Sequence, residues 1–154
     1  MGVTMMTARS SGGHLRSRAM ANQKRALGAD LWFVTSVGSA KLQDLSADPH
    51  VNLAYYKDGS REWISVSGIA TVIRDRAKIQ ELYEPDWKMW FTSEASENDP
   101  LAGTVNDPQI ILIGVQIHRA TFFAVDRAAP VVMYEMAKGW LTGTAPDLGE
   151  VRTL

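Results

Sequence analysis

Alternation of hydrophobic and polar residues marks much of the first half of the chain and predicts β-strands there. Within residues 51–57, Val51, Leu53 and Tyr55 fall on one side and polar or small residues on the other. This period of two is typical of a strand with one buried face. Leu31–Val37 is instead a continuous apolar, aromatic and β-branched run, which indicates a strand buried on both faces.

Turn residues separate these patterns into successive strands. We expect strands over Val3–Ala8, Leu15–Ala21, Leu31–Val37, Val51–Lys57, Glu62–Arg74, Ile110–Gln116 and Ala120–Val125. The glycines and serines of Arg9–Gly13 predict a hairpin between the first two strands, and His118-Arg119 reads as a turn between the last two. Gly68 indicates a bulge or bend.

Helical signals are fewer and shorter. We expect helices over Ala40–Ala47, from an N-cap at Asp75 through Glu84, as an aromatic turn over Trp87–Phe91, and over Val131–Leu141. Ser93–Asp107 reads as a polar loop and the final stretch as a tail. Six or seven sequential strands with peripheral helices predict a mainly β fold, most simply an antiparallel β-barrel with flanking helices.

Composition narrows the class of protein. The chain has 154 residues and no cysteine, which excludes disulfides, thiol nucleophiles and cysteine-ligated metals. We expect a single domain over residues 1–154. No apolar run approaches the roughly 20 residues of a membrane span, and the start lacks the features of a signal peptide. We therefore expect a cytoplasmic protein with no membrane partner.

Positive charge is concentrated near the start of the chain. Residues 1–29 carry Arg9, Arg16, Arg18, Lys24 and Arg25 and no acidic residue, although the net charge is only −1. The near-neutral chain argues against a dedicated nucleic-acid binder. A local site for a small anionic ligand is the better interpretation.

Four residues could form that site. Arg16 and Arg18 alternate along a strand and so share a face, while Ser39 and Lys41 stand at a predicted helix start, where free N–H groups favour a phosphate. The alternative is that Ser39 merely caps the helix and Lys41 is solvated. The segment Ser36–Lys41 lacks the glycine spacing of a Walker A loop. The motif Gly-x-Gly-x-x-Gly is also absent, which argues against a Rossmann dinucleotide site.

Other chemistry-bearing residues give weaker signals. The three histidines, His14, His50 and His118, lie next to turns without metal-binding spacing, so we expect surface positions and no metal site. Asp99 and Asp107 each precede a proline and read as turn formers. The five tryptophans are interpreted mainly as packing residues, with Trp87 and Trp90 on one face of a short helix in a core or dimer seam. The alternative is that one or two of them lie beside a planar ring ligand.

The order of several segments resembles a known family. The segments are Leu15–Met20, Leu31–Thr35, Ser39–Lys41, Asp48–Tyr55, Val66–Ala70, Asp75–Leu82, Lys88–Phe91 and Leu141–Pro146. Together they resemble the general stress protein branch of the pyridoxamine 5′-phosphate oxidase-like, FMN-binding split-barrel proteins. The resemblance implies a six-stranded antiparallel split barrel, a homodimer, and a flavin at the subunit interface.

The same resemblance implies which residues hold the flavin. These would be Arg16, Ser17, Arg18, Met20, Gln23, Val34, Thr35, Ser39 and Lys41, with Ser39 and Lys41 at the phosphate and Gln23 as a weaker polar contact. The cofactor would be FMN or FAD.

The sequence departs from the family pattern in three places. Ala19 replaces a frequent proline, the usual helix before the first strand is missing, and Thr92–Asp107 is longer than expected. The substrate contacts of a true pyridoxamine phosphate oxidase are not identifiable, so vitamin B6 synthesis is not our first choice.

The leading hypothesis is a low-specificity flavin oxidoreductase or stress-response flavoprotein, with no catalytic residue named. A non-catalytic flavin carrier or sensor is the alternative. A related barrel for another phosphorylated or tetrapyrrole ligand is the third.

Overall fold

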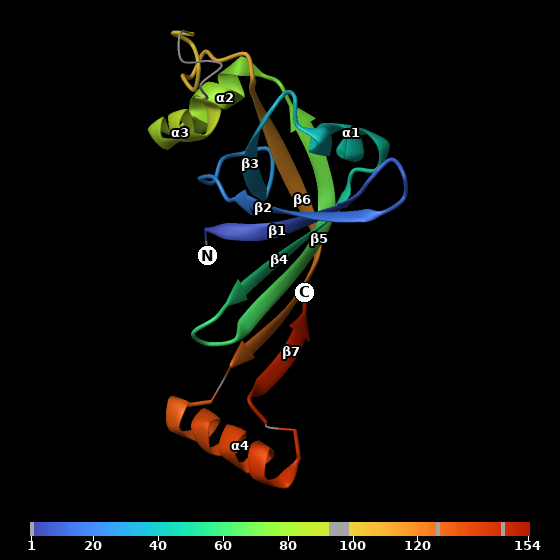
Figure 1. Ribbon diagram of the computed structural model, residues 1–154, viewed down its shortest axis with the longest axis vertical. Coiled ribbons are helices and arrows are strands. Elements are labelled where there is room, and N and C mark those ends of the chain that lie inside the picture. The colour runs from blue at the N-terminus through green and yellow to red at the C-terminus, as the bar shows by residue number, and fades with distance from the viewer. Residues whose placement is uncertain (1, 93–98, 126, 146) are drawn as a thin grey trace.

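The computed structural model describes residues 2–92, 99–125, 127–145 and 147–154. Its elements, in chain order, are β1 (Val3–Arg9), β2 (Leu15–Ala21), β3 (Leu31–Ser36), α1 (Ala40–Ala47), β4 (His50–Lys57), β5 (Glu62–Ile73), α2 (Arg76–Leu82), the 3₁₀ turn η1 (Pro85–Trp87), α3 (Lys88–Phe91), β6 (Ile110–Val125), α4 (Ala129–Thr142) and β7 (Gly149–Thr153). Figure 1 shows a sheet with α1, α2 and α3 near one end and α4 at the other.

The strands form one antiparallel sheet that curls toward closure, which confirms the predicted mainly β fold. Six strands run in the order β2-β1-β4-β5-β6-β3, and β7 adds to β6. The chain links the two ends of this path, because just beyond β2 the Gln23 N–H donates to the Trp32 carbonyl of β3 at 2.8 Å. The sheet is therefore a split barrel that is joined at β2 and β3.

The barrel encloses the larger hydrophobic core. Val51, Leu53 and Tyr55 of β4 are buried there, as their alternation predicts, together with Phe33 of β3 and Ile113 of β6. α1 covers one opening of this core with Leu42 and Leu45. The predicted bounds of α1 are confirmed.

A second core lies on the outer side of β3 and β6. Trp32, Leu112 and Trp87 are buried between these strands and the segment containing α2 and η1. The start of β6 therefore has both faces buried, with Ile113 in one core and Leu112 in the other. This explains why residues 110–115 form an unbroken apolar run rather than an alternating one.

The predicted turn at His118-Arg119 is wrong. β6 is one continuous strand of 16 residues, and its register against β5 shifts at Ser67/Gly68, where His118 is the extra residue. Two adjacent polar residues here mark a bulge rather than a reversal. The bulge predicted at Gly68 is confirmed, since a Cβ there would clash with the backbone oxygen of Gln116.

The expected C-terminal tail is also wrong. Residues 149–153 form β7, which pairs antiparallel with the end of β6 and leaves α4 between the two strands. α4 is longer at both ends than the predicted Val131–Leu141. The short, charged sequence of β7 lacks the alternation that marks the other strands, so its pairing depends on β6.

The α2–α3 region agrees with its predicted start. The Asp75 carboxylate accepts from the Ala77 N–H, so Asp75 is the expected N-cap. α2 ends at Leu82, before the predicted Glu84, and Pro85 begins η1. Of the predicted loop Ser93–Asp107, residues 93–98 lie outside the described residues, while Asp99 and Asp107 accept local backbone N–H groups, as expected for turn formers.

Candidate functional site

The main candidate site is a cavity at the join of β2 and β3, which we call the join cavity. Its volume is about 400 Å³. It is lined by Val3, Ala19, Met20, Ala21, Gln23, Val34, Thr35, Ser36, Lys41, Asp86, Trp87, Trp90 and Phe91. Five of the nine predicted site residues therefore share one cavity: Met20, Gln23, Val34, Thr35 and Lys41.

Lys41 is the cationic group of this cavity. It lies in the first turn of α1, and its half-buried ammonium donates to the Thr35 hydroxyl at 2.9 Å. Burial, and secondarily the nearby Arg18 guanidinium, lower the pKa of Lys41 below its usual 10.5. Among the described residues, no carboxylate lies within ion-pair distance of it. A desolvated cation without a counter-charge favours an anionic ligand.

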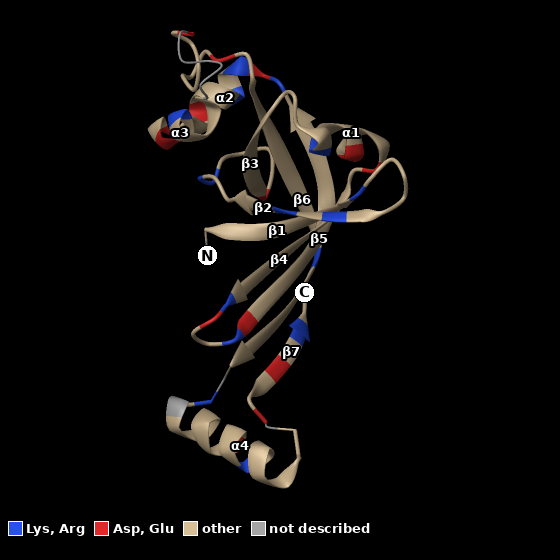
Figure 2. Cartoon of the chain, viewed as in Figure 1, with Lys and Arg blue, Asp and Glu red and all other residues tan. Residues whose placement is uncertain are grey.

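Arg18 has a carboxylate partner. Its Nη2 lies 2.6 Å from Oδ2 of Asp44, a nearly fully buried residue of α1. The basic positions of β2 and α1 and the acidic position of α1 are visible in Figure 2. Sequence reasoning missed this pair, although Asp44 was the acidic residue inside a predicted helix close to Lys41. Arg18 therefore adds positive potential near Lys41 without lining the join cavity.

The remaining predicted residues are not brought to the join cavity. Arg16 is exposed on β2, and the Ser17 hydroxyl is bonded to Thr7 on the neighbouring strand at 2.6 Å. Ser39 occupies the N-cap position of α1, but its side chain makes no capping bond, and it lines a separate, open hollow with Arg74. The interpretation of Ser39 as the N-cap residue of α1 is therefore correct, but the capping hydrogen bond expected from its hydroxyl is not formed.

Hydrogen bonds hold the Gln23 amide in one wall of the join cavity. The Trp87 indole N–H donates to Oε1 of Gln23 at 2.7 Å, and Gln23 Nε2 donates to the Ala21 carbonyl at 3.1 Å. Trp87 is almost completely buried, and its ring also meets Tyr83 edge-on. Gln23 is thus held at the cavity by both ends of its amide.

Sequence reasoning missed the aromatic side of the cavity. Trp87 belongs to the second core, as packing predicts, but it also lines the cavity, and Trp90 stands on the rim with 74% of its surface exposed. The signal was the spacing of Trp87 and Trp90 with Phe91 directly following. This spacing alone favours packing and does not single out Trp87 and Trp90 as cavity residues.

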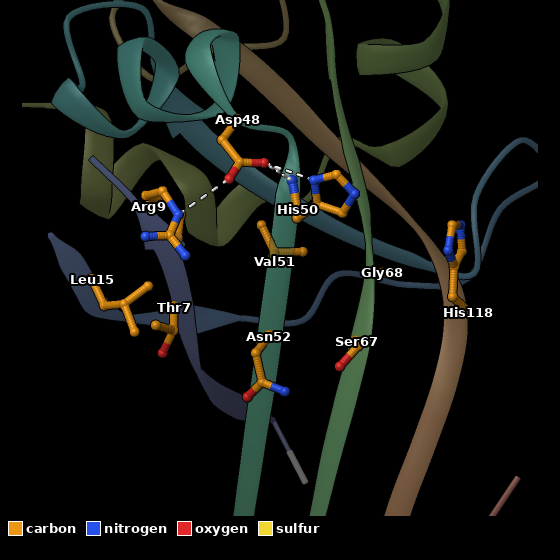
Figure 3. Close-up of a pocket in the computed structure, with 11 residues that line it drawn as sticks. Thr7, Arg9, Leu15, Asp48, His50, Val51, Asn52, Ser67, Gly68 and His118 are labelled. Carbon is orange, nitrogen blue, oxygen red and sulfur yellow. Dashed lines mark hydrogen bonds and ion pairs between the residues drawn. The ribbon is translucent and has the colours of Figure 1, made fainter. Parts of the chain in front are cut away.

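A second cavity of about 320 Å³ lies at β1, β4 and β5. Figure 3 shows Asp48 between Arg9 and His50: His50 Nδ1 lies 2.7 Å from Oδ1 of Asp48, and Arg9 Nε lies 3.5 Å from Oδ2. The hydrogen bond from His50 is the main cause of a lowered pKa at Asp48. His14, His50 and His118 are exposed, as expected, but sequence reasoning missed the carboxylate two residues before His50.

This second cavity offers an exposed ion-pair cluster without a buried cation. The join cavity combines a half-buried cation, apolar walls and an amide, and is the better candidate for an organic anion. Within the described residues, no helix has the length and apolar character that a membrane crossing requires.

Comparison with known proteins agrees with this fold and extends along most of the chain. The family model described as pyridoxamine 5′-phosphate oxidase like matches residues 1–147. The Neurospora crassa protein named bli-3 is 31% identical over 153 residues, which cover 98% of this chain and 72% of that protein.

Solved structures show the same architecture at lower identity. A general stress protein 26 of Jannaschia sp. CCS1 matches with a TM-score of 0.69 and 23% identity, over 100% of this chain and 90% of that one. The general stress FMN/FAD binding protein of Xanthomonas citri matches with a TM-score of 0.64 and 22% identity, over 82% of each chain. On the evidence of the family model and of bli-3, the chain belongs to the pyridoxamine 5′-phosphate oxidase-like family.

Proposed function

We propose that the chain binds a flavin nucleotide, FMN in the first instance and FAD as the alternative, in the join cavity. The observation that carries the proposal is the half-buried Lys41 ammonium, which among the described residues lacks a carboxylate partner. A phosphate dianion supplies the counter-charge that this ammonium lacks. The Xanthomonas citri relative, described as an FMN/FAD binding protein, supports the choice of ligand.

The residues of the cavity suit such a ligand. Lys41 and Thr35 would hold the phosphate, Met20 and Val34 would contact apolar parts of the ring, and Gln23 would offer its amide. Arg16, Ser17, Arg18 and Ser39 stay predictions from the family resemblance. When bound, a flavin supplies hydride and electron transfer, while the protein supplies position and electrostatics.

We also propose a homodimer with the cavity at its interface. The outward face of β1, β2, β4, β5, β6 and β7, here called the uncovered sheet face, carries the exposed apolar residues Val3, Met5, Tyr56 and Val151. Val3, paired in register with Ala21, belongs to this face and also lines the join cavity. A partner on this face would therefore lie beside the ligand.

The proposed activity is that of a low-specificity, cytoplasmic flavin oxidoreductase in a single domain, with a non-catalytic carrier or sensor as the second candidate. The greater length of Thr92–Asp107 compared with the family pattern, and the absence of identifiable pyridoxamine contacts in the sequence, disfavour vitamin B6 synthesis.

The test is a flavin titration of the purified apo-protein, followed by anaerobic addition of NADH or NADPH. We expect FMN fluorescence to be quenched at a one-to-one stoichiometry per chain. Bleaching by the nicotinamide and recovery in air would identify an oxidoreductase, and a bound flavin that stays oxidised would identify a carrier. A protein that binds neither FMN nor FAD would overturn the proposal.

A further inference from the structure

The helix α4 presents its most apolar side to solvent. Trp140, Leu141, Met133 and Tyr134 are exposed by 87%, 76%, 73% and 65%. Glu135 of the same helix is less exposed than these apolar residues, with a side chain that is only 18% exposed. A surface helix normally has the opposite arrangement, with its apolar stripe on its own core and its charges outside.

α4 is also remote from both cores of its own chain. It connects the ends of β6 and β7, and the β6–β7 extension holds it at the far end of the molecule from α2 and α3 (Figure 1). Among the residues of α4 whose side chains the structure describes, none belongs to either hydrophobic core. The apolar side of α4 therefore needs a partner that is not its own domain.

The opposite end of the molecule also carries exposed apolar side chains. In α3, Met89 and Trp90 are exposed by 72% and 74%, and Trp90 lies on the rim of the join cavity. The uncovered sheet face lies between these two ends (Figure 1). In a two-fold symmetric dimer, a contact between one surface of the first copy and a different surface of the second copy occurs twice, once in each direction.

We propose that α4 of a second copy of this chain packs against α3 and closes the join cavity. A two-fold axis through the uncovered sheet face and perpendicular to the long axis exchanges the two ends of the molecule. It thus brings α4 of each copy to α3 of the other. The inference rests on the homodimer of the proposed function and adds which segment of the partner reaches the site.

Area and charge favour this occupant. A stable interface buries on the order of 800 Å² per partner, and Trp or Tyr side chains each contribute about 150–250 Å², so α4 and the uncovered sheet face together are sufficient. A membrane surface is disfavoured, because helices that lie on membranes are rich in lysine and arginine. α4 carries one lysine, Lys138, and one glutamate, and Figure 2 shows it almost free of charge.

The absence of cysteine permits a direct test with the full chain. Single Trp140→Cys and Met89→Cys variants, carrying tags of different size, are mixed as apo-proteins and treated with a short bismaleimide. We expect a covalent heterodimer. Leu27→Cys, at a residue that is 87% exposed elsewhere on the surface, replaces Met89→Cys as the matched control and should give no product with Trp140→Cys.

Three results would overturn the inference. Trp140→Cys could cross-link only with itself, which would place α4 against α4. A dimer measured by light scattering could cross-link equally with Met89→Cys and Leu27→Cys. The wild-type protein could be a monomer at micromolar concentration. Flavin enters none of these measurements, so a cross-linked protein that binds no flavin would refute the proposed function and leave the α4 contact standing.

A second measurement tests the energetics. A Met133→Ser, Trp140→Ser double variant should raise the dimer dissociation constant at least tenfold in analytical ultracentrifugation, while Leu27→Ser should leave it unchanged. Both substitutions lie on exposed helix positions outside the cores, so the monomer fold should be retained in circular dichroism. An unaltered dissociation constant in the double variant would contradict the proposal.

Discussion

The join cavity depends on one residue that is unfavourable for folding. Lys41 is half-buried, and its pKa is lowered chiefly by burial, which means that the apo-protein penalises its charged form. The unfolded chain therefore binds more protons than the folded chain between the lowered pKa and 10.5, and the free energy of unfolding rises with pH through that window. A bound phosphate would instead stabilise the charged form of Lys41.

Replacing Lys41 with methionine should therefore have two effects of opposite sign. The Lys41→Met apo-protein should unfold at a higher temperature, because an unpaired, partly desolvated charge is lost. Its affinity for FMN should fall by about 1.5–3 kcal/mol, tenfold to more than a hundredfold, the range for a hydrogen bond to a charged group. Calorimetry of the apo-protein and a fluorescence titration measure the two effects.

The control for Lys41 is Lys57→Met, at an exposed lysine that pairs with Glu62 at 3.4 Å on the β4–β5 hairpin. Wild-type affinity for FMN should weaken as the pH rises through the lowered pKa of Lys41, and this dependence should be absent in Lys41→Met. An unchanged FMN affinity in Lys41→Met would show that the phosphate is bound elsewhere.

The Asp48–His50 pair is a second residue-scale feature with a measurable titration. Because the pKa of Asp48 is lowered mainly by the hydrogen bond from His50, the pair stabilises the fold above pH 3.8 and loses this contribution as the pH falls through the lowered value. In His50→Ala, the pKa of Asp48 should return toward 3.8, as followed by NMR of the carboxyl carbon. His14→Ala, at another exposed histidine, should not change it.

At the scale of elements, the sequence predicts those strands and helices whose position is determined by the local pattern of hydrophobic and polar residues. The strands with alternating faces and α1 were predictable because periodicity and burial coincide in them. The continuity of β6 was not, because a bulge at His118 and a turn there share the same polar residues. The pairing of β7 and the ion pair between Arg18 and Asp44 depend on neighbours distant in sequence, which no local pattern encodes.

The β5–β6 bulge is maintained by the lack of a side chain at Gly68. A Gly68→Ala variant should lose about 1–3 kcal/mol of stability, as overpacking does in a close-packed interior, because the added methyl would meet the backbone of Gln116 and the Val115 side chain. Urea denaturation measures the loss. Gly59→Ala, at a turn with open space around the glycine, should remain within about 0.5 kcal/mol of wild type.

At the scale of the whole molecule, β6 makes the two cores interdependent. Its consecutive residues Leu112 and Ile113 are fully buried in different cores. A strand cannot leave one core without leaving the other. The barrel and the α2–η1 layer that carries Trp87 should consequently unfold together.

Leu112→Ala and Ile113→Ala test this coupling. Each should destabilise the protein by about 2–5 kcal/mol, as truncation of a buried aliphatic side chain does. In each variant, tryptophan fluorescence and far-ultraviolet circular dichroism should report the same urea midpoint, although Trp32 and Trp87 lie in only one of the cores. Leu112→Ala that shifts the fluorescence midpoint alone would show that the outer layer melts independently.

The hydrogen bond from Trp87 to Gln23 also has an optical consequence. A buried indole emits at shorter wavelength than an exposed one, in the range where an oxidised flavin absorbs, and the hydrogen bond to Gln23 holds Trp87 in the wall of the join cavity. The excitation energy of Trp87 would be transferred by resonance to a ligand that absorbs in this wavelength range, such as a flavin. A colourless phosphate compound would not accept it. The protein thus contains an internal emitter that reports which kind of molecule fills its cavity.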